Sequence, residues 1–198
     1  MRTSGGRDDR ALVIVDVQND FCDVAGAALP VAGGAALARR ISRHVRRSGG
    51  RYAAVVATRD WHIDPGDHFS TAPDFAGTWP PHCVAGSSGA NFHPDLETAL
   101  VEAVFSKGQF SASYTGFDGV SGDGATLHDW LESRGLTALD VVGIATDYCV
   151  RATVLDAARL GFTTRVLADL CVGVAPDSTR AALGEMAAVG EVVTGASD

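Results

Sequence analysis

Several protein classes are excluded by features that this chain of 198 residues lacks. It has no apolar run of about 18 residues, so no membrane-spanning helix is predicted. Its opening segment, MRTSGGRDDR, contains no apolar stretch of the kind that marks secretion signals. Its four cysteines, Cys22, Cys83, Cys149 and Cys171, form no CxxC pair and are too sparse for a disulfide scaffold. We therefore expect free thiols and a cytoplasmic protein.

Positive charge is scarce as well. The chain has 16 Lys and Arg residues against 24 Asp and Glu residues, a net charge of −8. Such a protein repels nucleic acid and anionic membranes at long range, so neither is expected as a partner. The glycines at 119–124 do not follow a strand in GxGxxG or P-loop register, and no GxSxG occurs. A small-molecule partner fits best, and the sequence leaves the oligomeric state open.

Short β-branched and apolar runs alternate with helical patterns, which is typical of repeated βα units and a parallel sheet. Strands are predicted at 11–17, 52–58, 101–106, 140–144, 163–167 and 191–194. Helices are predicted at 34–47, 126–134, 147–160 and 178–189, with Gly49, Gly135 and Gly161 as C-terminal stops. The predicted fold class is α/β with a six-stranded, mostly parallel sheet. We expect one domain at 10–198 and a flexible tail at 1–9.

The connection at 59–100 is too long for an ordinary crossover, and long loops inside domains are usually functional. Within 23 residues it contains Asp60, His62, His68 and His82, so this stretch holds half of the six histidines of the chain. Imidazole and carboxylate together suit iron, manganese or zinc. We therefore predict that these four residues bind one divalent metal ion. The alternative is structural: an aspartate that caps a loop, two surface histidines, and one histidine packed under the turn at 79–81.

Polar residues also stand where the predicted strands end. Asp16, Asp60 and Lys107 close the first three strands, and Cys149 follows the fourth at the start of a predicted helix. Open parallel sheets bind their ligands beyond the carboxyl ends of the strands. We therefore expect these side chains to meet in one place.

A cysteine attacks as a thiolate, which its usual pKa of about 8.5 disfavours at neutral pH. We expect the helix N-terminus and Lys107 to lower the pKa of Cys149, and Asp16 to act first as base and then as acid. The amides of Ala145 and Cys149 would form an oxyanion hole. This predicts acyl transfer through a thioester. Alternatively, Asp16 caps a loop, Lys107 is an exposed lysine and Cys149 fills the core.

The motifs that carry these residues resemble a known family. They are IVDVQNDFC (14–22), TRDWHIDPGDHF (58–69), TWPPHCVAGSSGANFHP (78–94), VFSKG (104–108), YTGF (114–117) and VVGIATDYCV (141–150). They resemble nicotinamidases of the isochorismatase-like cysteine hydrolase superfamily, especially the pyrazinamide-activating enzymes of actinobacteria. The resemblance runs from about residue 10 to the end of the chain.

The resemblance implies a three-layer αβα fold and hydrolysis of nicotinamide to nicotinate and ammonia, with pyrazinamide as a further substrate. It implies a catalytic triad of Asp16, Lys107 and Cys149, and a cis peptide bond between Ile144 and Ala145. The implied metal ligands are Asp60, His62, His68 and His82, and the implied substrate-binding residues are Phe21, Trp79 and Tyr114. In such enzymes the ion positions the pyridine ring. The sequence departs from the actinobacterial pattern at Tyr148 and at Ser87 and Ser88, which leaves fine substrate preference open.

Other functions compete with this prediction. Related amidases act on ureidoacrylate or N-carbamoyl amides and isochorismatases act on a vinyl ether, but these relatives generally lack the full ligand set. A non-haem iron oxygenase also uses two histidines and a carboxylate, but it would leave Asp16, Lys107 and Cys149 without a role. The third alternative is a catalytically inactive binding module on the same fold.

Overall fold

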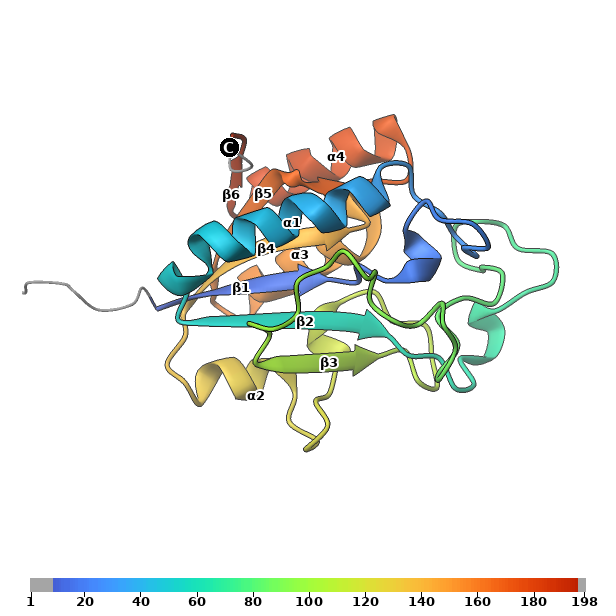
Figure 1. The fold of residues 1–198 in the computed structure, drawn as a ribbon, viewed down its shortest axis with the longest axis horizontal. Helices are drawn as coiled ribbons and strands as arrows, with labels where there is room; N and C mark the ends of the chain where they lie inside the picture. The colour runs from blue at the N-terminus through green and yellow to red at the C-terminus, as the bar shows by residue number, and fades with distance from the viewer. Residues whose placement is uncertain (1–8, 196–198) are drawn as a thin grey trace, which may run out of the picture.

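The computed structural model describes residues 9–195 and contains one parallel sheet covered by helices on both faces (Figure 1). The sheet has six strands in the order β3-β2-β1-β4-β5-β6, and each neighbouring pair is parallel. The strands are β1 Arg10–Val15, β2 Ala54–Asp60, β3 Ala103–Lys107, β4 Ala138–Ile144, β5 Thr163–Val172 and β6 Glu191–Val193. The predicted α/β class and six-stranded parallel sheet are therefore confirmed.

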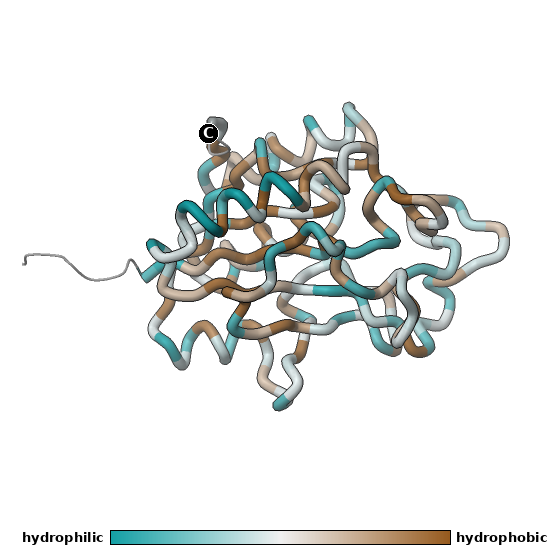
Figure 2. The backbone as a smooth tube through the Cα atoms, in the orientation of Figure 1, coloured by the Kyte–Doolittle hydropathy of each residue, from teal (hydrophilic) through white to brown (hydrophobic). Residues whose placement is uncertain are grey.

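The helices divide between the two faces of the sheet. They are α1 Gly34–Ser48, α2 Leu127–Glu132, α3 Arg151–Arg159 and α4 Pro176–Ala187. On one face α1 packs through Leu37 and Ile41 onto strand residues such as Leu12, while α2, α3 and α4 cover the other face. Strand residues are buried on both faces, which explains their nearly unbroken apolar sequence. Figure 2 shows this as hydrophobic colour along the central strands.

The order of the strands fixes where a ligand can bind. From β1 the chain moves outward to β2 and β3, then returns to β4 on the other side of β1 and moves outward again to β6. The loops that leave β1 and β4 therefore diverge to opposite sides, and they leave a crevice at the carboxyl ends of these two strands. Asp16 directly follows β1, and Ala145 directly follows β4. The topology itself brings these two segments together.

Some predicted boundaries differ from the structure. The helix expected at 147–160 consists of a π-helical turn, Thr146–Val150, followed by α3. Strand β5 continues to Val172, five residues past its predicted end at 167, because its last residues pair with β4 again after an irregularity between Val141 and Gly143. Gly135 and Gly161 follow α2 and α3 with positive φ, as expected for helix stops. Gly49 instead continues into a short 3-10 turn.

The connection between β2 and β3 has little regular structure. Much of it lies beyond the carboxyl ends of the strands, and its last part runs back beside α1 to the start of β3 (Figure 1). Single bridges between His62 and Val84 and between Phe69 and Trp79 hold it together. Within residues 9–195, no helix is long and apolar enough to cross a membrane. The predicted flexible tail lies outside the described residues except for Asp9, whose carbonyl accepts a hydrogen bond from Thr137 N at 3.1 Å.

Candidate active site and metal centre

Lys107 lies at the centre of the polar cluster at the strand ends. It is the last residue of β3 and is fully buried. Its Nζ is 3.0 Å from Asp16 Oδ2 and 3.6 Å from Cys149 Sγ, and it also donates to Asp60 Oδ1. Burial alone would lower the pKa of Lys107, but Asp16, Asp60 and Cys149 raise it well above its usual value. The lysine is therefore a permanent ammonium ion that binds three acidic groups together.

Asp16 is held on two sides. Thr58, which is fully buried in β2, donates its hydroxyl to Asp16 Oδ1 at 2.6 Å, and Thr58 O accepts from Asp16 N at 3.2 Å. Asp16 has a φ of 49°, which is uncommon for a residue with a side chain. Burial raises the pKa of its carboxyl, while Lys107 and Thr58 act against that rise. Asp16 is thus a basic carboxylate with a fixed orientation.

Cys149 occupies the π-helical turn after β4. The carbonyl of Ala145 accepts from Tyr148 N and Val150 N, both at 3.1 Å, which fixes the backbone of this turn. The bond between Ile144 and Ala145 is cis, as expected. Sγ of Cys149 and carboxylate oxygens of Asp16 and Asp60 all lie within 4.8 Å of one another.

The expected lowering of the Cys149 pKa is wrong for this structure. Burial raises the pKa of the thiol well above its usual value, and the carboxylates of Asp16 and Asp60 add to the rise. Lys107 acts in the expected direction, but its charge is outweighed. The sequence could not give this balance because it depends on how deeply the thiol is buried and on which carboxylates face it. The resting cysteine is a neutral thiol.

The three histidines of the long connection also meet. One ring nitrogen from each of His62, His68 and His82 lies within 4.8 Å of the other two, and all three residues are buried. Asp60 Oδ2 is 3.7 Å from His62 Nε2 and 3.9 Å from His82 Nε2. Asp60 therefore faces Lys107 with one carboxylate oxygen and the histidines with the other.

The hydrogen bonds of the rings show which nitrogens are available. His62 Nδ1 donates to Gly108 O at 2.6 Å and His82 Nδ1 donates to Pro80 O at 2.9 Å, because a carbonyl can only accept. Each Nε2 then carries a lone pair toward the cluster, which is the usual arrangement of metal-binding histidines. Among residues 9–195, His62 Nε2 and His68 Nδ1 are buried without a hydrogen-bond partner. Buried acceptors without partners fit a bound cation.

The charge states of these groups fit a metal ion too. Burial lowers the pKa of His68, and it lowers the pKa of His82 to about 4, so both rings are neutral at physiological pH. Burial alone would raise the pKa of the Asp60 carboxyl, but Lys107 and His62 hold it below its usual value. Neutral imidazole and ionised carboxylate are the forms that bind metal. The donor set suits a divalent transition metal.

One cavity of about 330 Å³ connects the two clusters. Asp60, His68, His82 and Cys149 line it, together with Phe21, Trp79 and Tyr114, the residues expected to bind substrate. Trp79 Nε1 donates to Tyr114 Oη at 3.0 Å, and the ring of Tyr148 packs edge-on against Trp79 at 5.2 Å between centroids. Aromatic walls with polar groups at one end suit a flat heteroaromatic ligand.

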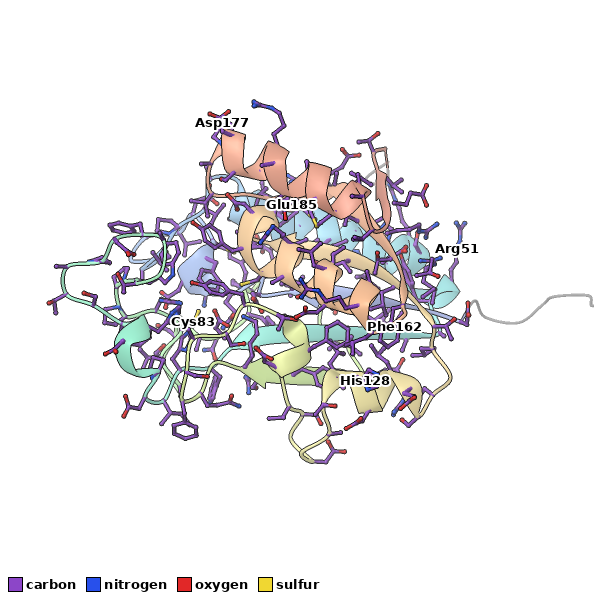
Figure 3. The ribbon with its side chains drawn as sticks, turned by 180° about the vertical axis from the view of Figure 1, so that it is seen from behind. Arg51, Cys83, His128, Phe162, Asp177 and Glu185 are labelled. Carbon is purple, nitrogen blue, oxygen red and sulfur yellow. The ribbon has the colours of Figure 1, made fainter. Side chains whose placement is uncertain are left out.

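Several residues that support the site were not predicted from the sequence. Gln18 is fully buried and binds the backbone of Asp60, and Thr58 orients Asp16. Asp147 accepts from Val174 N at 2.9 Å and from Ser178 Oγ at 2.5 Å, which attaches the turn of Cys149 to the start of α4. For Gln18, the only signal in the sequence was a polar residue within the motif IVDVQNDFC. Cys83 is fully buried among the loops beyond the strand ends (Figure 3).

Comparisons with known proteins agree with this arrangement. The family model described as "Isochorismatase domain" matches residues 10–198. The nicotinamidase/pyrazinamidase of Mycobacterium tuberculosis is 58% identical over 177 residues, which cover 89% of this chain and 94% of that protein. A crystal structure from L. infantum in complex with nicotinate has a TM-score of 0.83 and 33% identity, and covers 100% of this chain and 98% of the other. The pyrazinamidase of Pyrococcus horikoshii in complex with zinc has a TM-score of 0.78 and 36% identity, covering 94% and 99%. This chain therefore belongs to the isochorismatase family.

Proposed function

We propose that this protein is a nicotinamidase, which hydrolyses nicotinamide to nicotinate and ammonia and also converts pyrazinamide to pyrazinoic acid. The observation that carries the proposal is the buried Asp16, Lys107 and Cys149 cluster at the inner end of an aromatic-lined cavity. The relatives named above support the choice of amide, since one acts on nicotinamide and pyrazinamide by name and another holds nicotinate.

The reaction begins with the neutral thiol of Cys149. Asp16, whose pKa burial raises, accepts the thiol proton as the sulfur attacks the amide carbon. The backbone amides of Ala145 and Cys149 stabilise the oxyanion, which contributes about a hundred- to a thousandfold in rate per donor. Asp16 then returns the proton to the leaving nitrogen, and ammonia departs to leave a thioester. Lys107 keeps acid and nucleophile in register throughout.

Hydrolysis of the thioester uses the same residues in reverse. Asp16 accepts a proton from a water molecule that attacks the thioester carbonyl, and it then protonates the departing sulfur. The products are the carboxylic acid and the free Cys149 thiol. One water molecule is consumed for each ammonia released, so the atoms balance.

Asp60, His62, His68 and His82 are the proposed ligands of one divalent ion, which is iron, manganese or zinc. When bound, this ion supplies a Lewis-acid partner for the ring nitrogen of the substrate and so orients the amide toward Cys149. The chain contributes the imidazoles, of which those of His62 and His82 are oriented by hydrogen bonds from Nδ1 to backbone carbonyls, and the ionised carboxylate of Asp60. We further propose one domain at 10–198, with the metal-binding loop at 59–100, working in the cytoplasm on small amides.

Ammonia release from nicotinamide and pyrazinamide tests the proposal. The wild type is compared with Cys149→Ala and with Cys171→Ala, which removes a buried thiol that lies against Leu167 O, outside the cavity. We expect Cys149→Ala to lose activity by at least about a thousandfold, as loss of a nucleophile does. Cys171→Ala is expected to retain most of it. Undiminished activity in Cys149→Ala would reject the mechanism. If the wild type hydrolysed other amides but neither nicotinamide nor pyrazinamide, the proposed substrates would be rejected.

A further inference from the structure

Two large apolar side chains that are open to solvent border the active-site cavity. Phe75 is 57% exposed and Val174 is 52% exposed, and both line the same cavity as Cys149. Among the exposed large apolar residues in 9–195, these are the two that do so. They come from different parts of the chain, the long connection after β2 and the segment before α4. Because both residues line one cavity, a single ligand bound there can contact both.

Phe75 is held in place by a hydrogen-bonded turn. Asp74 Oδ1 accepts from Ala76 N at 3.0 Å, from Gly77 N at 2.9 Å and from both Thr78 N and Thr78 Oγ1. Phe75 N donates to Thr78 O at 3.1 Å, and its ring lies edge-on to Trp79 at 6.1 Å. Phe75 also has a φ of 56°, a conformation that bulky side chains rarely adopt. The chain therefore builds a specific turn that leaves this ring at the cavity.

Val174 is also fixed, and its support connects to the nucleophile. Its backbone N–H donates to Asp147 Oδ1 at 2.9 Å, and Ala175 N donates to Oδ2 of the same carboxylate at 3.3 Å. Asp147 lies in the π-helical turn that carries Cys149. The position of Val174 is thus set relative to the sulfur that the substrate must reach.

Leu29, Pro30 and Tyr148 also line the cavity. Like Phe75 and Val174, each is apolar or aromatic and at least partly exposed to solvent. We call the five residues Leu29, Pro30, Phe75, Tyr148 and Val174 the apolar rim. Among the described residues that line the cavity, the carboxylate and histidine side chains are those of Asp60, His68 and His82, which belong to the buried cluster. The cavity is therefore polar at its buried end and apolar at its solvent side.

We propose that the apolar rim is a second subsite, which binds an apolar substituent on the ring of an aromatic carboxamide whose amide lies at Cys149. The inference rests on the proposed function and extends its substrate class from unsubstituted pyridine and pyrazine amides to alkyl-substituted ones. A cavity of about 330 Å³ falls in the range that encloses ligands larger than one ring bearing an amide. The reaction stays the same: water is consumed, the amide C–N bond breaks and ammonia leaves.

The first measurement compares kcat/KM of the metal-loaded enzyme for nicotinamide and for methyl, ethyl and propyl nicotinamides substituted at each free ring carbon in turn. We expect one ring position at which kcat/KM rises by about fourfold for each added methylene, the equivalent of about 0.8 kcal/mol of buried apolar surface. A carboxymethyl group at that position is expected to reduce kcat/KM below that of nicotinamide, because its charge would enter an uncharged rim. No advantage for alkyl at any position overturns the proposal.

The second measurement assigns the effect to the rim. In Phe75→Ala and Val174→Ala, the ratio of kcat/KM for the propyl compound to that for nicotinamide is expected to fall at least about fivefold. Phe110→Ala is the matched control, since Phe110 is 71% exposed but does not line the cavity, and it should keep the wild-type ratio. Thermal unfolding of each variant shows that the fold is intact. Ratios unchanged in both rim variants overturn the assignment.

A binding assay separates this inference from the proposed function. Calorimetry on metal-loaded Cys149→Ala gives the affinities of nicotinamide and the propyl compound without turnover. Tighter binding of the propyl compound, lost when Phe75→Ala is added, supports the rim even if the wild type hydrolyses neither amide, an outcome that would reject only the nicotinamidase activity. Equal affinities for the two compounds reject the rim while leaving the activity untouched.

Discussion

Gln18 binds both backbone groups of Asp60. Its Nε2 donates to Asp60 O at 2.8 Å and its Oε1 accepts from Asp60 N at 2.8 Å, so its side-chain amide does what a neighbouring strand would do. The same Nε2 donates to Ala90 O at 2.9 Å. Gln18 is fully buried, and Asp60 is the residue shared by the Lys107 cluster and the histidine cluster. One glutamine after β1 therefore fixes the junction between the Lys107 cluster and the histidine cluster.

Gln18→Ala is expected to lower the free energy of unfolding by about 3 kcal/mol, because buried N–H and C=O groups of Asp60 and Ala90 lose their partner. Urea unfolding measures this change. Asn19→Ala is the control, since it removes a single exposed hydrogen bond to Ser88 O, and it should cost less than about 1 kcal/mol. Equal effects of the two substitutions would contradict the role assigned to Gln18.

Lys107→Met should destabilise the protein by about 3 to 5 kcal/mol, because it leaves the carboxylates of Asp16 and Asp60 buried beside each other without a counter-charge. The variant should also lose amide hydrolysis. The comparison is Arg180→Met, which breaks an exposed ion pair with Asp177, the residue labelled on α4 in Figure 3. That pair contributes about 0 to 1 kcal/mol. Chemical denaturation of both variants decides whether burial makes the difference.

Removal of a metal ligand and removal of the nucleophile should differ in their effects on metal content and substrate binding. His62→Ala is expected to lose bound metal and substrate affinity, while Cys149→Ala keeps both and loses only turnover. Metal analysis and calorimetric nicotinamide binding measure the two properties. A chelator should lower the stability of Cys149→Ala by about 2.7 kcal/mol if the ion was present at about a hundred times its Kd. Normal metal content in His62→Ala would rule out the ligand assignment.

Acid should remove one stabilising contact at the start of α1. Asp23 accepts from Ala35 N at 2.8 Å and Gly33 N at 3.1 Å, and these bonds lower the pKa of its carboxyl below the usual 3.8. A pKa that is lower in the folded state means that this contribution is complete above pH 3.8 and is lost as the pH falls through the folded-state value. Asp23→Ala should therefore be less stable than wild type by about 1 kcal/mol at pH 7.

That difference should shrink toward zero as the pH is lowered below the folded-state pKa of Asp23. Urea titrations of both proteins over a pH series measure it. A gap that stays constant down to the lowest pH would show that the charge of Asp23 is not what stabilises the helix start.

The sheet could be predicted because its strands are buried on both faces. Strand β1 reads as a nearly continuous apolar run, and the polar residues stand out where strands end, Asp16 directly after β1 and Lys107 as the last residue of β3. The end of β5 could not be predicted. Its extra pairing depends on Gly143, where a Cβ would come within 2.1 Å of Val15 O, a contact between residues distant in sequence.

The chemistry of the candidate site could also be predicted from the sequence. Asp16 and Lys107 follow apolar runs, the histidines are closely spaced, and thiol, ammonium, carboxylate and imidazole groups each support only a few kinds of chemistry. The supporting residues were not readable. Thr58, Asp147 and Phe75 have ordinary sequence surroundings, and their roles come from partners in other segments of the chain.

The sequence by itself determined the α/β class, the order of the elements, and the residue types from which a thiol nucleophile and a metal centre can be made. Local patterns carry that information, since side-chain periodicity and residue chemistry act over a few positions. Only the tertiary structure decided that Asp60 serves both clusters, that Cys149 rests as a neutral thiol and that Phe75 and Val174 border one cavity. These properties depend on burial and on distances between residues far apart in the chain, which sequence spacing does not specify.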